Sequence, residues 1–409
     1  MMTELLAPAG NLEKLKIAVH YGADAVYFGG QEFSLRAHAG NFSESEMEEA
    51  VNFAHDHGAK AYVTVNIFAH NRDMKKIPEY LMWLSEIGAD ALIISDPGIF
   101  RIARTTVPAI PIHVSTQANT TNLESAIFWK QAGASRVNLA RELSLEEIRE
   151  IAGGSGIETE VFVHGALCIS YSGRCMLSLY MTGRDANQGA CAHPCRYRYA
   201  LQEEKRPGVY FPVEEDERGV YIFNSRDLCL INRLPELIEA GVNSLKIEGR
   251  MKGIFYVAGV VRAYRAALDW VLEQRARGHE MLKVPEEFME ELKPLGSRGY
   301  TENFIDGPPD SDDMLYQGRS ADQTFSPAAV VVKAGNIPLL RVGHILRPGD
   351  RLEYMEKGLD ITRFEVIEVR DQHGKKIRQA LGGEVVTVTT EPEVEWEEWA
   401  VVRRVNSEK

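Results

Sequence analysis

The chain has 409 residues, of which 44% are hydrophobic and 26% are charged, so it can bury a large core and is neither disordered nor fibrous. The formal net charge of −13 disfavours a protein that coats nucleic acid without specificity, because contacts to phosphates need Lys and Arg. The N-terminal sequence lacks a basic segment followed by an apolar run, and no stretch approaches the roughly 20 apolar residues of a membrane span. We therefore expect a cytoplasmic protein without membrane contact.

Short apolar runs alternate with helical patterns up to about residue 270, which predicts repeated βα units around a parallel sheet. Eight strands are expected, at Glu4–Ala7, Ala25–Phe28, Ala61–Asn66, Ala91–Ser95, Ile112–Ser115, Arg136–Ala140, Glu160–His164 and Ser244–Glu248. Apolar spacing near 3.6 residues predicts helices between them, including Leu12–Tyr21, Glu44–Asp56, Leu143–Ile151 and Leu228–Ala240. Eight such units favour an α/β fold with a closed (β/α)8 barrel of the TIM type over an open doubly wound sheet.

One connection is far longer than the others. Roughly 80 residues separate the seventh expected strand from the eighth, well beyond an ordinary βα loop, and this connection contains all five cysteines. The loops after the strands form the functional face of such barrels, so we expect the insertion at 166–219 to be functional. A short strand at Val220–Phe223 is expected to return the chain to the barrel. Basic residues that fit either a solvated face or a nucleic-acid patch are Arg174, Arg184, Arg196, Arg198, Lys205 and Arg206.

The pattern divides the chain into three parts. Residues 1–275 form the expected barrel domain, and residues 276–325 predict a charged linker with one helix at Pro285–Leu292. Residues 326–409 predict a small all-β domain, a barrel or a sandwich, because short strands alternate there with Gly-rich or charged turns. Its expected strands are Ala328–Lys333, Ile345, Arg351–Tyr354, Thr362–Val369, Glu384–Thr389 and Trp399–Val402.

Four cysteines form the densest group of potential metal ligands, namely Cys168, Cys175, Cys191 and Cys195. The odd total of five and the absence of an export signal disfavour a disulfide framework. Such a set suits zinc or an iron-sulfur cluster, and free buried thiols are a third alternative. The spacings CxxxxxxC and CxxxC differ from the paired CxxC knuckles of zinc ribbons, so we favour a cluster. Cys229 stands apart in an apolar helical pattern, which predicts a packed core thiol.

Polar residues follow the carboxyl ends of several expected strands, where barrel enzymes place their active sites. They are Asn66, His70, Asp96, Ser115, Gln117, Asn119, Arg141, Glu142, His164, Lys246, Glu248 and Arg250. Arg250 and Arg141 suit a carboxylate substrate, because a guanidinium can form paired hydrogen bonds with it. His164 and His113 are candidates for proton transfer.

Two alternative interpretations of this rim stay open. Glu248 and Arg250 could form an ion pair that only closes the barrel. Asp96 and Glu142 could bind a divalent cation or act as general acid and base in hydrolysis. The sequence contains neither an HExxH nor a GxSxG motif, so a conventional protease mechanism lacks support.

The segment from Glu160 to Ser178, EVFVHGALCISYSGRCMLS, closely resembles the signature of the collagenase-like peptidase family, and in particular of its tRNA 5-hydroxyuridine hydroxylase members. Further stretches that match the family are Leu6–Gly10, Gly22–Tyr27, Ser115–Asn119, Arg141–Ser144, Asn224–Leu228, Ser244–Arg250 and Arg298–Tyr300. The resemblance covers the barrel and the linker. The length, with a small C-terminal β domain, looks most like the tRNA branch.

The resemblance implies hydroxylation of the wobble uridine of tRNA to 5-hydroxyuridine, with prephenate as the oxygen donor and a 4Fe-4S cluster as cofactor. The residues that match the family's cluster ligands are Cys168, Cys175, Cys191 and Cys195. Cys229 departs from the pattern, because some relatives replace the last cysteine of CxxxC with one further along the chain.

The implied active site comprises Arg250, Glu248, His164 and Arg141, with the arginines binding the dicarboxylate prephenate. A uridine flipped out of its stack would enter the barrel mouth, and basic residues of the insertion would hold the anticodon arm. The alternatives are a collagenase-like peptidase, a hydroxylase of another substrate such as an rRNA cytidine, and a non-catalytic RNA-binding or assembly factor.

Overall fold

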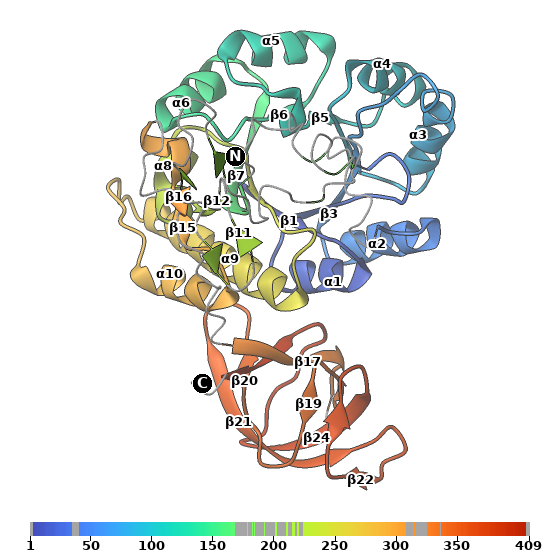
Figure 1. Cartoon of the computed structure of the whole chain (residues 1–409), viewed down its shortest axis with the longest axis vertical. Coiled ribbons are helices and arrows are strands. Elements are labelled where there is room, and N and C mark those ends of the chain that lie inside the picture. Colours follow the sequence, from blue (N-terminus) through green and yellow to red (C-terminus); the bar gives the residue numbers. More distant parts are fainter. Residues whose placement is uncertain are drawn as a thin grey trace.

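A computed structural model describes residues 3–34, 41–167, 226–307, 325–335 and 337–405, four single residues (178, 182, 184 and 192), and several two-residue strands between them. The chain forms a helix-covered barrel and a smaller β domain, which lies below the barrel in Figure 1. None of the helices in the described part of the chain has the length and apolar composition that crossing a membrane requires.

Eight parallel strands close into the predicted barrel. They are β1 (Glu4–Pro8), β2 (Ala25–Phe28), β3 (Lys60–Val65), β4 (Ala91–Ile94), β5 (Ile112–Val114), β6 (Arg136–Asn138), β7 (Glu158–Gly165) and β14 (Ser244–Ile247). Each strand pairs with the next, and Ser244 of β14 pairs with Glu4 of β1 on one side and with Glu160 of β7 on the other. The (β/α)8 prediction is therefore confirmed.

Helices surround the strands (Figure 1). They are α1 (Leu12–His20), α2 (Glu44–Asp56), α3 (Ile77–Glu86), α4 (Pro97–Thr106), α5 (Leu123–Ala132), α6 (Leu145–Gly154), α8 (Leu234–Glu239) and α9 (Ile254–Ala276). Local sequence fixes several of their starts, since Ser43 and Ser144 each form a capping box with a glutamate three residues later. Asp96 caps α4 by accepting a hydrogen bond from the N–H of Ile99 at 2.9 Å. This contact gives Asp96 a local structural role.

One prediction around the return to the barrel is wrong, and another falls largely outside the described residues. Residues 228 and 229 do not start a helix, because β13 (Asp227–Cys229) pairs antiparallel with the end of β7, and α8 begins only at Leu234. The strand that returns the chain to the barrel is thus β13. In the 220–223 region, β11 (Gly219–Val220) pairs with β10 (Glu215–Asp216), and residues 221–223 lie outside the described part of the chain. The other short strands are β8 (Leu201–Gln202), β9 (Tyr210–Phe211), β12 (Asn224–Ser225), β15 (Tyr300–Thr301) and β16 (Met314–Leu315).

The helix α10 (Glu286–Leu292) is followed by β15, which pairs with β13 of the barrel sheet. From Phe325 the chain forms the C-terminal β domain, where six antiparallel strands close a second barrel. They are β17 (Phe325–Lys333), β18 (Leu339–Val342), β20 (Arg351–Met355), β21 (Ile361–Arg370), β24 (Val385–Glu391) and β25 (Val401–Val405), and three short strands β19 (Ile345–Leu346), β22 (Lys376–Ile377) and β23 (Ala380–Leu381) accompany them. The expected all-β domain is confirmed as a barrel. The sequence prediction missed β18.

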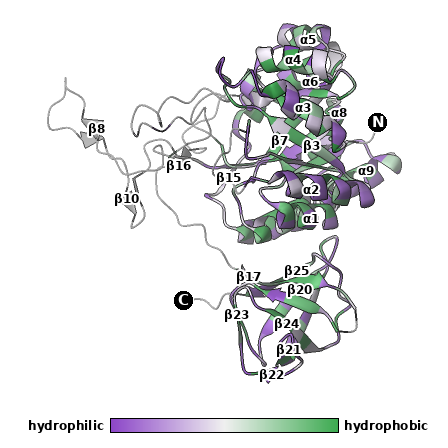
Figure 2. Ribbon diagram, turned by 90° about the vertical axis from the view of Figure 1, so that its right-hand side faces the viewer, coloured by the Kyte–Doolittle hydropathy of each residue, from purple (hydrophilic) through white to green (hydrophobic). Residues whose placement is uncertain are grey.

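The two domains are joined by buried polar contacts. Tyr21, which follows α1, donates its hydroxyl hydrogen to Met355 O at 2.9 Å and accepts one from the N–H of Val401 at 2.9 Å. Arg262 of α9 is fully buried; it hydrogen-bonds the carbonyls of Gly358 and Asp360. In Figure 2 the β domain lies directly beneath α1. The β domain is therefore held at the outer helix layer of the barrel, where α1 and α9 lie.

Candidate active site at the barrel rim

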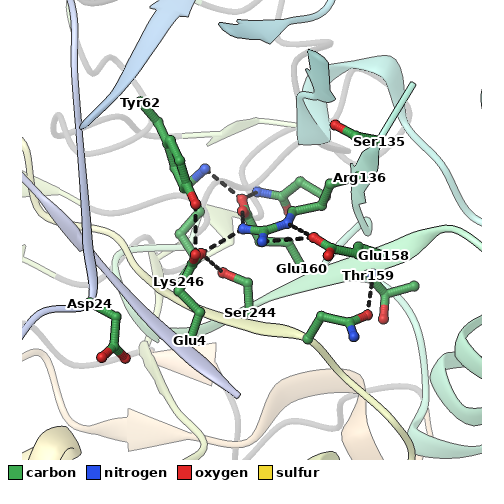
Figure 3. A network of polar contacts seen from close by, with 12 residues as sticks. Glu4, Asp24, Tyr62, Ser135, Arg136, Glu158, Thr159, Glu160, Ser244 and Lys246 are labelled. Carbon is green, nitrogen blue, oxygen red and sulfur yellow. Dashed lines mark hydrogen bonds and ion pairs between the residues drawn. The ribbon is translucent and has the colours of Figure 1, made fainter. Parts of the chain in front are cut away.

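A network of charged and polar side chains links the N-terminal ends of β1, β6, β7 and β14 (Figure 3). The Arg136 guanidinium bonds Glu4 at 2.5 Å, and the Tyr62 hydroxyl donates to the same carboxylate at 2.6 Å. Burial alone would raise the pKa of Glu4, but Arg136 and these hydrogen bonds more than offset it and lower that pKa. Glu160 accepts hydrogen bonds from Lys246 Nζ at 2.7 Å. The floor beneath the rim is thus an ordered ionic network, which lies beside a small apolar cluster that includes Leu6, Tyr62 and Ile93.

Lys246 lies in β14, and Glu248 follows directly after the last residue of that strand, Ile247. The Lys246 ammonium lies 4.4 Å from the ring centroid of Tyr27 and 5.4 Å from that of Phe162. The Tyr27 hydroxyl donates to Ile247 O at 2.9 Å and contacts Glu248 Oε2 at 3.3 Å. Glu248 therefore reaches the rim beside a phenol and above a buried cation.

Arg250 is only 4% exposed, and its guanidinium is held at the β2 and β3 side of the rim. It donates to Ser34 Oγ at 3.1 Å, to Thr64 Oγ1 at 3.4 Å and to Asn41 Oδ1 at 2.9 Å. The ion pairs between described residues do not include one between Glu248 and Arg250. The interpretation of these two residues as a simple barrel-closing pair therefore finds no support.

Arg141 lies past the end of β6 and spans the gap to the end of β7. Its Nη1 donates to Ala166 O at 2.9 Å, and its guanidinium carbon lies 3.9 Å from the Phe162 ring centroid. Its buried Nε has no hydrogen-bond partner among the described residues. The stacked Arg141 thus keeps its Nε–H available as a donor, and it lies on the opposite side of the barrel from Arg250, which bonds residues of β3 and of the segment after β2.

His164 lies away from this group. Its ring is 1% exposed and packs against Tyr256 and Tyr264 of α9 and against Tyr300, with centroid distances of 5.9, 5.4 and 5.3 Å. Burial lowers the pKa of His164 to about 3, although Asp227 opposes the shift. The helix α9 covers the outside of the barrel, so His164 faces the helix layer. Its role in proton transfer stays a prediction.

A further polar group spans β3 and β5. Gln117 Oε1 accepts hydrogen bonds from Asn66 Nδ2 at 2.7 Å and from the Ser115 hydroxyl at 2.9 Å. The nearby His113 is buried against Tyr62 with a centroid distance of 4.7 Å, and burial lowers its pKa well below the ordinary value. These side chains come from different strand ends, as expected for a barrel active site.

The sequence analysis missed Tyr27, Asn138, Glu160 and Phe162, which the structure brings to the same interior. A signal for them existed. Arg136 and Asn138 alternate with the apolar residues Val137 and Leu139, and Glu160 lies between Thr159 and Val161 in a strand that is otherwise buried after its first residue. Polar residues at every second position of such strands indicate a polar barrel interior.

The comparison with known proteins now decides the family. A sequence model described as peptidase family U32 matches residues 10–315. The chain belongs to peptidase family U32. The tRNA hydroxylation protein P1 of Bacillus subtilis (strain 168) is 41% identical over 381 residues, which cover 92% of this chain and 89% of the relative. The tRNA hydroxylation protein P of Escherichia coli (strain K12) is 39% identical over 395 residues, 86% of each chain. A 23S rRNA 5-hydroxycytidine synthase of the same Escherichia coli strain is 39% identical over 272 residues, 66% of this chain and 40% of the relative.

In this U32 chain the predicted ligands Cys168, Cys175, Cys191 and Cys195 lie outside the described residues. Within the described part, no three His, Cys, Asp or Glu side chains are grouped as a metal would need. The residue before Cys168, Leu167, is buried just beyond the end of β7. Four thiols within 28 residues of the sequence are a chemically suitable donor set for an iron-sulfur cluster.

Cys229 has different surroundings. Its thiol is 2% exposed and lies 3.7 Å from the Tyr264 hydroxyl. Burial raises the pKa of Cys229 to about 11, which disfavours the thiolate that a metal ligand needs. The expectation of a packed core thiol is therefore confirmed, and Cys229 is poorly suited to replace Cys195 as a ligand.

Proposed function

We propose that this protein is a tRNA hydroxylase that converts the wobble uridine to 5-hydroxyuridine, with prephenate as the oxygen donor and a 4Fe-4S cluster. The observation that carries the proposal is the similarity to two tRNA hydroxylation proteins over 92% and 86% of this chain. The 92% alignment leaves out less than a tenth of the chain, so it must extend into the C-terminal β domain. The rRNA synthase alignment is shorter, at 66%, and this difference favours a tRNA substrate.

Prephenate carries two carboxylates, and the rim offers two guanidinium groups from opposite sides. Arg250 is held by Ser34, Thr64 and Asn41, so it would lose little rotamer freedom when it binds a carboxylate. Arg141 is fixed by Ala166 O and by stacking on Phe162. In this proposal, Arg250 and Arg141 each bind one carboxylate of prephenate.

Hydroxylation of a ring carbon releases a proton, and Glu248 is the rim carboxylate that would accept it. Its contact with the Tyr27 hydroxyl at 3.3 Å orients the carboxylate, and the same hydroxyl is anchored on Ile247 O. His164, whose pKa of about 3 keeps it neutral, acts in this proposal by positioning the end of β7, because its ring contacts tyrosines.

The cluster ligands in this proposal are Cys168, Cys175, Cys191 and Cys195. When bound by these cysteines, a 4Fe-4S cluster would supply electron transfer. The decisive first experiment is anaerobic purification with iron and sulfide analysis, on the parent and on Cys168→Ala, Cys191→Ala, Cys195→Ala and, as the control, Cys229→Ala. We expect about four irons per chain, lost in the first three variants and kept in the control. Zinc, or no metal in protein kept free of oxygen, would sink the proposal.

The iron-loaded protein is then incubated with unmodified tRNA, with and without prephenate, and the nucleosides are analysed by mass spectrometry. We expect 5-hydroxyuridine only when prephenate is present. The alternatives predict other outcomes. A peptidase would cleave peptides even after loss of the cluster, an rRNA enzyme would modify a cytidine, and a binding factor would not respond to prephenate.

A further inference from the structure

Gln117 belongs to a one-turn 3-10 helix (Thr116–Ala118) that follows β5, and its amide is held in one orientation. Asn66 Nδ2 and the Ser115 hydroxyl both donate to Gln117 Oε1. The Nε2 end therefore points away from these two side chains. It is buried, the residue is 8% exposed, and Nε2 has no hydrogen-bond partner among the described residues. Gln117 thus presents two amide hydrogens for which none of the described residues supplies an acceptor.

Asn138 of β6 shows the complementary arrangement. Its Nδ2 donates to Glu160 Oε1 at 2.6 Å, and an ionised carboxylate can only accept, so the amide orientation is again fixed. The ion pair with Lys246, at 2.7 Å on the same oxygen, keeps Glu160 in place. Asn138 is 2% exposed, and its Oδ1 is buried without a partner in the described part of the chain. Asn138 therefore presents an acceptor.

The two amides occupy neighbouring places on the inner side of the barrel. The Thr116 hydroxyl donates to Leu139 O at 3.3 Å, and Thr120 bridges to Leu139, so the turn that carries Gln117 is fastened to the residue after Asn138. The contact between Gln117 and Asn66 joins the ends of β3 and β5, which are separated by β4, so it lies over the barrel interior. The Gln117 donor and the Asn138 acceptor therefore come from β6 and from the turn that follows its neighbour β5.

We infer that Gln117 and Asn138 recognise the imide edge of a uracil base. The O4 atom of uracil would accept from Gln117 Nε2, and its N3–H would donate to Asn138 Oδ1. A cytosine in the same orientation presents an amino donor and a ring-nitrogen acceptor, so both contacts would be reversed. This inference rests on the proposed function and names the residues that select uridine over cytidine.

The test compares two anticodon stem-loop RNAs that differ only in U or C at the wobble position. Gln117→Glu keeps an oxygen for Asn66 and Ser115 and places the second oxygen where the donors were. The matched control is Gln131→Glu, which makes the same change at an exposed position of α5. Binding is measured by fluorescence anisotropy. We expect the parent and the control to prefer the U-containing RNA about tenfold or more, and Gln117→Glu to lose that preference or reverse it.

A second variant, Gln117→Met, removes the donors without adding charge, so it should abolish the preference without reversing it. In the prephenate-dependent reaction, Gln117→Glu should lower kcat/KM for the U-containing RNA about ten- to hundredfold and leave KM for prephenate unchanged. Equal binding of both RNAs by the parent would overturn the inference. A changed KM for prephenate in Gln117→Glu would also overturn it, because Gln117 would then bind a carboxylate of prephenate. A switch in binding without any hydroxylation would refute the proposed function alone.

Discussion

Replacing Arg262 with Met tests the buried contact between the two domains. Arg262 donates to the carbonyls of Gly358 and Asp360 and to Glu291, the last at 3.0 Å. Each carbonyl bond contributes about 1 kcal/mol, and the bond to the carboxylate about 1.5–3 kcal/mol. Glu291 still accepts a hydrogen bond from Arg403 at 2.8 Å, so the loss of its bond to Arg262 costs less than this sum. We therefore expect Arg262→Met to lower the free energy of unfolding by about 3 kcal/mol, measured by urea denaturation.

The matched control is Arg363→Met in the same domain. Arg363 bonds Glu353 at 3.0 Å, but its side chain is 83% exposed, so water and salt screen the ion pair and its loss should cost less than about 1 kcal/mol. If Arg262→Met were as harmless as Arg363→Met, the buried contacts would not stabilise the docking of the β domain, and the reasoning would be wrong.

Two further predictions concern the rim and its support. The pKa of His164 is about 3 in the folded chain and 6.5 ordinarily, so in acid the histidine takes up a proton when the chain unfolds. The contribution of neutral His164 to the free energy of unfolding is therefore complete above pH 6.5 and is lost as the pH falls towards 3. The free energy of unfolding, measured by urea denaturation, should fall between about pH 7 and about pH 5 by about 2 kcal/mol less in His164→Asn than in the parent. The same pH dependence in both proteins would contradict this. Gly10→Ala places a Cβ 2.0 Å from Arg250 O and should displace Arg250. In the reaction proposed above, kcat/KM for prephenate should then fall about tenfold or more, whereas full activity would show that Arg250 tolerates displacement.

The barrel could be predicted from the sequence because each βα unit carries its own signal. A run such as Ala25–Phe28 is apolar and short, and the Glu44–Asp56 helix has both apolar spacing and a capping box. The strand β13 escaped prediction for the opposite reason. Leu228 and Cys229 fit a helical pattern equally well, and only pairing with His164 and Gly165 of β7 makes them a strand. Such pairing is set by distant residues, which local patterns do not encode.

The candidate site was predictable in its location but not in its contacts. The carboxyl ends of the strands indicated Gln117, Glu248 and Arg250, and the structure places all three near the rim. The sequence could not show that Arg250 bonds Ser34, because that contact joins residues 216 positions apart. Nor could it show that His164 faces α9, since the register between β7 and β14 shifts beside His164 and alternation alone does not place its ring.

The ionic floor explains how buried amides can be kept ready for a ligand. A polar atom without a partner is tolerated in a folded protein only where the surrounding structure holds it in place. Asn138 is held by Glu160, and Glu160 is in turn held by Lys246 and lies 3.5 Å from Arg136. An apolar floor would leave the Asn138 amide free to rotate, and its acceptor would then have no fixed direction. The charged interior therefore gives the rim a defined pattern of donors and acceptors before any substrate binds.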